Sequence, residues 1–448
     1  MPALGLRFCA VVLLLCFWSG AAMAQAVRME GVVRDSNGRA IEGAVVTVKA
    51  GSASIATTTD SKGAFTLENF PQKSGAIEVH AWGFAVAEQT WDAGAGPVIH
   101  LEIVLEVLSV REQVVVTATR MPERLGDVAG SSVTLSSDEL DATPALAVDD
   151  KLKQIPGFSL FRRTGSRWAN PTSQGVSLSG LGASGASRAL VLEDGVPLND
   201  PFGGWIQWPM IPEQALARVE VVPRGASSLY GGDALGGVIQ FFTKQPEEPS
   251  LSLEAAYGNQ NTPDLSLWAG GRSGKWDSSV SVDLFHTDGY ILVPAADRGA
   301  VDTPANSEDA AVSLTIGRQL NGRTRIFGRG SFFTESRDNG TPVQTNDTQI
   351  ATGVLGLDAG VGATGTFSVR LYGDAQSYDQ NFSSIAADRN SESLTDKQHV
   401  PAQRVGGTAW WSEPVGKWQT LGAGVELGEV IGSSDEDIFS SGKQTATQ

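Results

Sequence analysis

The second half of the chain repeats one pattern, in which apolar and polar residues alternate through short segments. In residues 280–284, 312–316 and 367–372, every second residue is apolar and most of the others are polar. Successive side chains of a β-strand point to opposite faces, so the pattern predicts strands with one apolar and one polar face. Such faces suit a barrel with lipid outside and water inside, although a soluble two-sided sheet would show them too. The alternating segments are residues 251–257, 265–271, 279–286, 310–317, 325–333, 354–361, 367–374 and 419–430.

The length of this region limits how many strands it can form. Residues 246–448 provide about 200 positions, and a membrane-spanning strand uses about 9–11 residues. Eight or nine strands are therefore expected. A barrel of eight strands has room only for its own side chains, and the polar tail 440–448 is not the amphipathic strand expected at the end of a barrel. We therefore expect a truncated barrel, whose open edge would leave backbone groups unpaired in lipid.

The first residues resemble a secretory signal peptide. Arg7 precedes an apolar run over residues 8–18, and Ala22-Met23-Ala24 places small residues where a signal peptidase cleaves. The run is shorter than the ~20 residues of a membrane-spanning helix. The alternative is a buried N-terminal helix. The pattern predicts an exported chain that begins at Gln25 after removal of residues 1–24.

Charge and cysteine usage exclude several classes of protein. The formal net charge is −17, so nucleic acid is not an expected partner. Both cysteines, Cys9 and Cys16, lie in the predicted signal peptide. The mature chain is therefore expected to contain no disulfide and no thiol ligand for a metal.

Residues 25–108 predict a small β-sandwich. Short β-branched runs are separated by turn residues such as Asn37-Gly38 and the segment 60–63. The stretch resembles carboxypeptidase regulatory-like domains through GVVRD (31–35), GAVVTV (43–48), TDSKGAF (59–65) and GF (83–84). No zinc peptidase is implied, because no histidine is followed three positions later by glutamate.

Residues 123–245 contain the most specific set of motifs. They are QGVSLSGLG (174–182), RALVLEDGVPLND (188–200), RVEVV (218–222), GASSLYG (225–231) and ALGGVI (234–239). In this order they resemble the plug domain of TonB-dependent outer-membrane receptors. The resemblance implies a compact α+β plug inside the lumen of a large barrel. It also implies uptake of a scarce ligand without covalent chemistry.

The plug motifs depart from the family pattern at two places. Ser179 stands where the family often has arginine, which puts any specific plug-to-barrel salt bridge in doubt. Pro223 precedes Arg224-Gly225 instead of following it, and the glycan-importing subtype tends to carry another motif here. Oligosaccharide import is therefore less favoured than import of iron chelates, corrinoids or other metal complexes.

A glycine motif in the plug matches a nucleotide-binding pattern only superficially. Residues 180–185 fit G-x-G-x-x-G, but the nucleotide mechanism needs a helix at the third glycine. An apolar strand-like run follows instead. The sequence also lacks a phosphate loop and a nucleophile elbow, so we expect no enzyme activity and no cofactor.

The linker 109–122 contains an apolar, β-branched run: Val114, Val115, Val116, Thr117 and Ala118. An extended segment of this kind can pair with the open edge of a partner sheet. It resembles the TonB box, which engages the energy-transducing protein TonB in the periplasm. The alternative is that it forms the last strand of the preceding sandwich. Its position directly ahead of the plug favours the first interpretation.

Two plug loops combine arginines with aromatic residues, which can bind anionic or flat ligands. The same residues can also simply contact the barrel wall, and the sequence favours neither role. The first loop contains Arg162, Arg163, Arg167 and Trp168, and the second contains Phe202, Trp205 and Trp208.

The predicted fold is mainly β, with a small β-sandwich, an α+β plug and the first strands of a truncated transmembrane barrel. The expected location is the outer membrane, and the expected partners are TonB, lipid and a small ligand. An alternative function is that of a β-rich surface protein with a structural or adhesive role and no transport.

Overall fold

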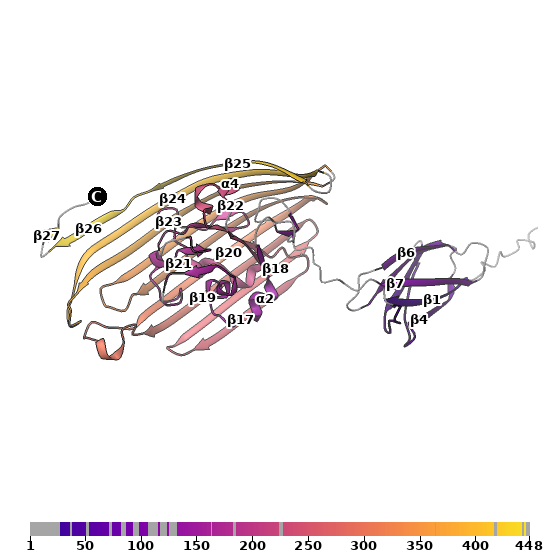
Figure 1. Cartoon of the computed structure of the whole chain (residues 1–448), viewed down its shortest axis with the longest axis horizontal. Helices are drawn as coiled ribbons and strands as arrows, with labels where there is room; N and C mark the ends of the chain where they lie inside the picture. Colours follow the sequence, from indigo (N-terminus) through magenta and orange to yellow (C-terminus); the bar gives the residue numbers. More distant parts are fainter. Residues whose placement is uncertain are drawn as a thin grey trace, which may run out of the picture. The chain divides into compact units, whose positions relative to one another are not determined.

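A computed structural model of the 448-residue chain forms two compact units, residues 1–113 and 114–448 (Figure 1). The predicted signal peptide lies outside the described residues. The structure describes residues 27–35, 38–50, 53–70, 74–81, 87–92, 98–105, 115–116, 123–124, 132–162, 164–181, 185–223, 227–362, 364–415, 419–440 and 443–444.

The first unit consists of two sheets around one apolar core, as predicted. The strands are β1 (Val27–Asp35), β2 (Val45–Ala50), β3 (Ala53–Thr58), β4 (Ala64–Phe70), β5 (Ser74–His80), β6 (Ala87–Asp92) and β7 (Val98–Leu105). The sheet orders are β4-β1-β7 and β3-β2-β5-β6, and only β1 and β7 pair in parallel among these described strands. Met29, Val46 and Ile77 are fully buried between the sheets.

Short strands follow in the linker and at the start of the second unit. Strand β8 (Val115–Val116) pairs antiparallel with β9 (Glu123–Arg124). The backbone of β8 thus pairs with residues directly after the linker and with none of the described strands of the sandwich. Val114, Thr117 and Ala118 lie outside the described residues.

The plug, as used below, is residues 132–245, and its centre is a mixed sheet in the order β10-β15-β16-β13-β14. Its strands are β10 (Val133–Ser136), β13 (Ala189–Glu193), β14 (Val196–Pro197), β15 (Leu216–Pro223) and β16 (Gly237–Thr243). A separate hairpin pairs β11 (Phe158–Leu160) with β12 (Val176–Leu178). Apolar side chains of these strands and of the connecting segments form one core, which includes Leu152, Val191 and Phe241.

Short helices connect the plug strands. They are α2 (Ser137–Ala142), α3 (Val148–Lys151), η1 (Leu152–Gln154), η2 (Pro171–Ser173), η3 (Trp208–Met210), η4 (Glu213–Ala215), α4 (Ser227–Tyr230) and η5 (Gly232–Ala234). Helix α2 begins with a capping box, in which the Ser136 side chain accepts from the backbone N–H of Glu139 and the Glu139 carboxylate accepts from the N–H of Ser136. Within the described residues, no helix is both long and apolar enough to cross a membrane.

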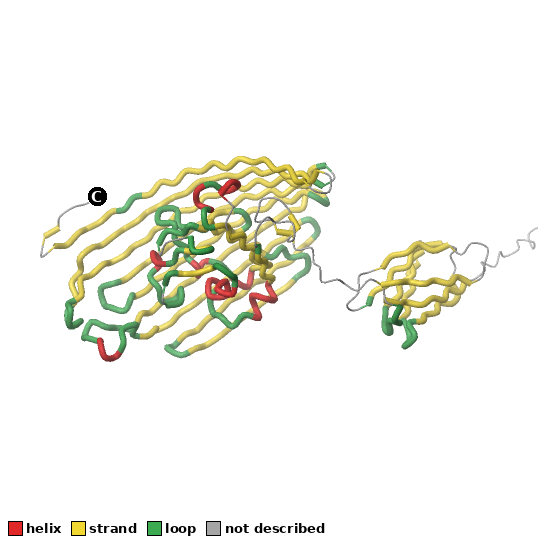
Figure 2. The backbone as a smooth tube through the Cα atoms, viewed as in Figure 1, coloured by secondary structure: helices red, strands yellow, loops and turns green. Residues whose placement is uncertain are grey.

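The rest of the second unit is an antiparallel sheet of long strands, called the wall here (Figures 1 and 2). Its strands are β17 (Ser250–Gly258), β18 (Thr262–Ser273), β19 (Trp276–Tyr290), β20 (Ala305–Asn321), β21 (Thr324–Asp338), β22 (Thr345–Val361), β23 (Gly365–Ile385), β24 (Glu392–Val415), β25 (Gln419–Gly432), β26 (Asp435–Ser440) and β27 (Lys443–Gln444). Each strand from β17 to β24 pairs with the next one along the chain. Both β25 and β26 pair with β24.

Burial along the wall strands follows the predicted alternation. The apolar side chains of Val312, Leu314 and Ile316 are exposed on the face away from the plug. On the neighbouring β21, Arg329 and Glu335 face the plug and are buried. At these positions the outer face of the wall is apolar, and its inner face carries charged side chains.

The two ends of the wall differ. At the end where the plug joins β17, two-residue turns connect β18 with β19 and β20 with β21. We call this the short-turn end. At the opposite long-loop end, the connection from β19 to β20 spans residues 291–304 and contains η6 (Ala295–Asp297).

The connections at the long-loop end are tied to one another. The Arg389 Nε donates to both carboxylate oxygens of Asp302 at 2.9 Å, and the backbone N–H of Thr303 donates to Gly340 O at 3.0 Å. The Arg389 guanidinium holds the pKa of Asp302 at about 2, well below its usual value.

Candidate functional site at the interface of the plug and the wall

The hairpin between β13 and β14 is the first place where the plug contacts the wall through charged groups. Asp194 and Gly195 form its turn with φ of 50° and 86°, the left-handed backbone that the Asp-Gly pair predicts. The Arg329 guanidinium from β21 lies 2.9 Å from a Glu193 carboxylate oxygen and 2.8 Å from one of Asp194. Only 4% of the Arg329 side chain is exposed, so this ion pair is largely shielded from water.

Two more wall arginines hold the backbone of the same hairpin. The Arg370 Nε donates to Asp194 O at 2.9 Å. Arg404 donates to Pro197 O at 2.7 Å and to Asn199 O at 3.0 Å. These donations satisfy carbonyl groups of the hairpin turn, of β14 and of the segment that follows it. Arginines of three strands therefore converge on one plug hairpin.

The plug loop 161–170 makes the second charged contact. The Arg167 guanidinium donates to both oxygens of Asp309 at 2.8 and 2.7 Å and stacks 4.1 Å from the centre of the Phe285 ring. Arg337 of β21 donates to the carbonyl oxygens of Ser166, at 3.2 Å, and Ala169. Two neighbouring wall strands, β20 and β21, therefore hold the loop through charge-assisted hydrogen bonds.

Aromatic pairs complete the interface. The ring centres of Trp168 and Tyr290 lie 5.7 Å apart, and those of Trp205 and Tyr378 lie 5.5 Å apart. The Tyr378 hydroxyl accepts from Asn346 Nδ2 at 2.6 Å, so the ring that receives Trp205 is fixed by the wall itself. Such offset aromatic contacts add about 0.5–1.5 kcal/mol each beyond the area that they bury.

The residues predicted from the sequence as ligand contacts lie in different environments in the structure. Arg167, Trp168 and Trp205 lie against the wall, as described above. Trp208 is 2% exposed and belongs to the plug core. Phe202 is 46% exposed. Arg163 lies outside the described residues, and a ligand role remains a prediction for these residues.

Arg162 is a structural residue inside the plug. Its guanidinium is paired with the fully buried carboxylate of Asp149 and lies 3.3 Å from Asp150. Burial, with the nearby charge of Arg337, lowers the pKa of Arg162 to about 10, which still leaves it charged at neutral pH. Since 2% of its side chain is exposed, it presents no surface to a ligand.

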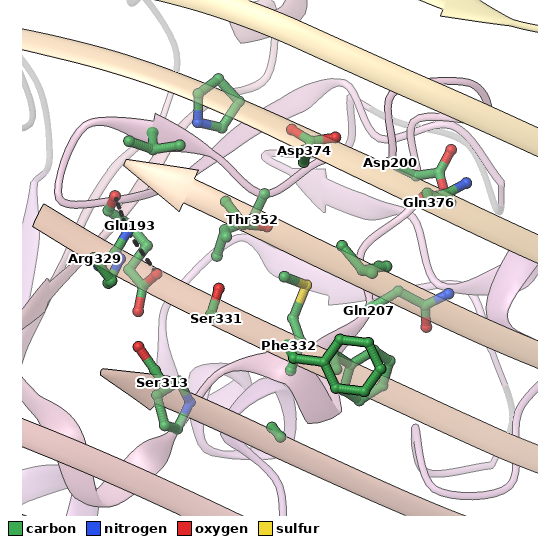
Figure 3. Close-up of a pocket in the computed structure, with 18 of the residues that line it drawn as sticks. Glu193, Asp200, Gln207, Ser313, Arg329, Ser331, Phe332, Thr352, Asp374 and Gln376 are labelled. Carbon is green, nitrogen blue, oxygen red and sulfur yellow. Dashed lines mark hydrogen bonds and ion pairs between the residues drawn. The ribbon is translucent and has the colours of Figure 1, made fainter. Parts of the chain in front are cut away.

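A small polar cleft lies between the plug hairpin and the middle of the wall (Figure 3). It has a volume of about 40 Å³, and its lining includes Glu193, Asp200, Gln207 and Gln376. Burial raises the pKa of both carboxyl groups, Glu193 and Asp200. Both polar atoms of the Gln207 amide lack a protein partner, so the cleft presents polar groups that no other protein group satisfies.

The wall arginines were missed by reasoning from the sequence. Arg325, Arg329 and Arg337 lie an even number of positions apart and therefore share a face of β21. This even spacing is the sequence feature that could have grouped the three arginines on one face. In the part of the chain that is described, no group of three or more His, Cys, Asp or Glu side chains is arranged to hold a metal ion.

Family models match two separate regions of the chain. Residues 124–238 match the TonB-dependent Receptor Plug Domain, and residues 28–106 match the Carboxypeptidase regulatory-like domain. A curated relative, the vitamin B12 transporter BtuB of Vibrio vulnificus (strain CMCP6), is 34% identical over 142 residues. That alignment covers 32% of this chain and 22% of the relative.

Solved structures share the fold at low sequence identity. The ferric citrate transporter FecA in its unliganded form has a TM-score of 0.58 at 14% identity, covering 72% of this chain and 51% of that one. The ferric-catecholate import receptor Fiu of K12 E. coli, in its closed form, has a TM-score of 0.57 at 16% identity, covering 71% and 49%. The siderophore receptor PirA of Acinetobacter baumannii has a TM-score of 0.55 at 15% identity, covering 70% and 49%.

The chain thus spans about half the length of these solved structures. The alignment with BtuB covers a smaller share, 22% of that relative. The plug motifs, the strand wall around the plug and the two family matches agree with one another. The chain thus contains a TonB-dependent receptor plug domain, with a carboxypeptidase regulatory-like domain ahead of it.

Proposed function

We propose that the protein is an outer-membrane importer of a scarce ligand and that TonB drives it by pulling on residues 114–118. One observation carries this proposal. The plug has an apolar core of its own, while it meets the wall through ion pairs, hydrogen bonds and small clusters of apolar side chains. A body with its own core can move as a unit, because polar contacts can be exchanged for contacts with water.

The orientation of the proposed importer follows from the two ends of the wall. Outer-membrane barrels have short turns on the periplasmic side and longer loops outside. The short-turn end, where the plug joins β17, would therefore face the periplasm. Residues 114–118 precede the plug in sequence and would be reached from the same side.

From the names of the relatives, we propose that the ligand is a metal-containing compound. The relatives are described as transporters of vitamin B12, ferric citrate and ferric catecholates. Direct uptake assays with these three compounds, in cells that lack their own receptors for them, would identify the class. No covalent step is part of the proposal, since the relatives are transporters and receptors.

The decisive experiment changes the backbone of the proposed coupling segment in the full-length receptor. Val115→Pro removes a backbone N–H and should abolish pairing with a partner strand. Binding of the compound at the cell surface should persist while energised uptake is lost. Val115→Ala keeps the donor and serves as the matched control.

A second control separates the internal pairing of this strand from its proposed use. Arg124 lies opposite Val115 in the short β8–β9 pair, so Arg124→Pro disturbs that pair without altering residues 114–118. We expect this variant to keep its uptake. Unchanged uptake in Val115→Pro would contradict the proposal and favour a structural or adhesive role.

A further inference from the structure

A hollow at the short-turn end of the second unit is lined by both the plug and the wall. Its volume is about 770 Å³, within the 300–1,000 Å³ range of small-molecule sites. Plug residues from β15, β16 and the segment that follows line one side, and inner-face residues of β19 to β24 line the other. The hollow is distinct from the small polar cleft in the middle of the wall.

Cationic side chains outnumber carboxylates around this hollow. Three carboxylates line it, and each already has an arginine partner. Asp194 is paired with Arg329 at 2.8 Å, Asp277 with Arg325 at 2.5 Å and Asp358 with Arg370 at 2.7 Å. The lining cations are Arg218, Lys244, Arg323, Arg325 and Arg370.

Two of these cations are held by neutral groups. Arg323 donates to Gly362 O at 2.5 Å and to Gly365 O at 3.4 Å. Lys244 donates through its Nζ to Gln214 O at 2.8 Å. Carbonyl oxygens orient a cation without neutralising it, so both positive charges remain available to the hollow. This local excess stands out in a chain with a net charge of −17.

Aromatic rings stand beside the cations. The Arg218 guanidinium, which is paired with Glu220 at 2.8 Å, lies 3.8 Å from the centre of the Phe242 ring. Trp410 also lines the hollow. Rings next to guanidinium groups provide flat apolar surface close to positive charge. A ligand that combines an aromatic ring with an anionic group matches both features.

We propose that this hollow is a binding site for an anionic aromatic group of the imported ligand, occupied on the periplasmic side of the plug. The assignment rests on the proposed importer function, because only a ligand that has passed the plug would reach this end from outside. The imported ligand is therefore expected to carry an anionic aromatic group. The assignment also places a second binding step after passage, between the plug and the wall strands.

The test uses two probes with the same ring and opposite charges, naphthalene-2-sulfonate and 2-naphthylmethylammonium. Equilibrium dialysis against the full-length receptor in neutral detergent measures their binding. We expect the sulfonate to bind more tightly, and its affinity to fall as salt is raised, because the charges are partly exposed. Tighter or equal binding of the ammonium probe would overturn the assignment.

Two substitutions locate the site. Arg323→Gln and Lys244→Gln should each weaken sulfonate binding roughly five- to tenfold, as expected for loss of one charge-assisted contact. Arg318→Gln is the matched control. Arg318 lies on β20, close to the turn that contains Arg323, but it lines an apolar depression on the outer face. If Arg318→Gln weakened binding as much as the other two, the probe would be bound elsewhere and the proposal would fail.

Failure of this inference is distinguishable from failure of the importer proposal. Probe binding needs no energy source, so it is measured independently of residues 114–118. Intact uptake without sulfonate binding would remove the hollow as a site and leave the importer proposal standing. Specific sulfonate binding without energised uptake would remove the importer proposal and, with it, the role assigned here to the bound group.

Discussion

Removing Arg329 should loosen the plug from the wall. In Arg329→Met, the Glu193 carboxylate loses its ion-pair partner, and its side chain is only 12% exposed. Asp194 is affected less, because it still accepts from the Thr243 hydroxyl at 2.7 Å and from the Thr243 N–H at 3.1 Å. Breaking a buried pair by removing one partner costs about 3–5 kcal/mol. We expect about 3 kcal/mol here, roughly a hundredfold in the ratio of released to seated plug.

The pH dependence of this variant has a defined sign. Burial raises the pKa of Glu193, whereas Arg329 lowers it, so the pKa rises further when the arginine is removed. The seated plug then binds a proton at Glu193 more tightly than the released plug does. By linkage, seating is strongest below the pKa of the released state and weakens as the pH rises through that of the seated state. The variant should therefore hold its plug better at pH 5 than at pH 8.

Protease access to the plug measures seating directly. The full-length receptor is digested under native conditions at both pH values, and cleavage of the β13–β14 hairpin is followed by mass spectrometry. Arg325→Met is the matched control, because its partner Asp277 lies on the wall and the pair is similarly buried. If Arg329→Met were cut no faster than Arg325→Met, the ion pair would not be what seats the plug. A variant cut more slowly at pH 8 than at pH 5 would refute the assigned state of Glu193.

Three further outcomes follow from single contacts. Tyr378→Phe keeps the ring but leaves the Asn346 amide without its acceptor, so the melting temperature of the full-length receptor should fall by the equivalent of about 1–3 kcal/mol. Gly203→Ala would place a Cβ 1.6 Å from the Trp205 ring, so a red shift of tryptophan fluorescence should report its displacement; an unchanged spectrum would contradict the packing. Asp302→Asn should raise hydrogen exchange in residues 299–303 and 386–391. In the wild type that protection should be constant from pH 8 to pH 5 and decline only as the pH falls towards about 2, since the lowered pKa of Asp302 confines the loss to acid.

The faces of the wall strands could be predicted from the sequence because they depend on local alternation alone. Val312, Leu314 and Ile316 are exposed on the outer face, as their spacing indicates. The inner face of strand β21 was harder to predict from the sequence. Phe327 and Phe333 face inward while Ile326 and Phe332 face outward, so apolar residues occupy both faces and periodicity does not identify the inner one.

The partners of the plug arginines and aromatic residues could not be predicted, because each lies far away in sequence. Arg167 meets a carboxylate 142 positions later, and Arg404 reaches a carbonyl 205 positions earlier. Such pairs depend on the register of several strands at once. The sequence raised doubt about a plug-to-barrel salt bridge because of Ser179. The structure has such bridges in both directions: Arg329 of the wall pairs with Glu193 and Asp194, and Arg167 of the plug pairs with Asp309.

The strand order of the plug decides how it would respond to mechanical force. Strand β10 is the first plug strand along the chain and lies at the edge of the sheet, joined to β15 by four residue pairs. Tension applied from the N-terminal side therefore loads this short edge strand first. The central strand β16, paired on both sides, would bear load only after β10 had detached. The plug would therefore yield in stages under such tension, beginning with the short edge strand on its N-terminal side.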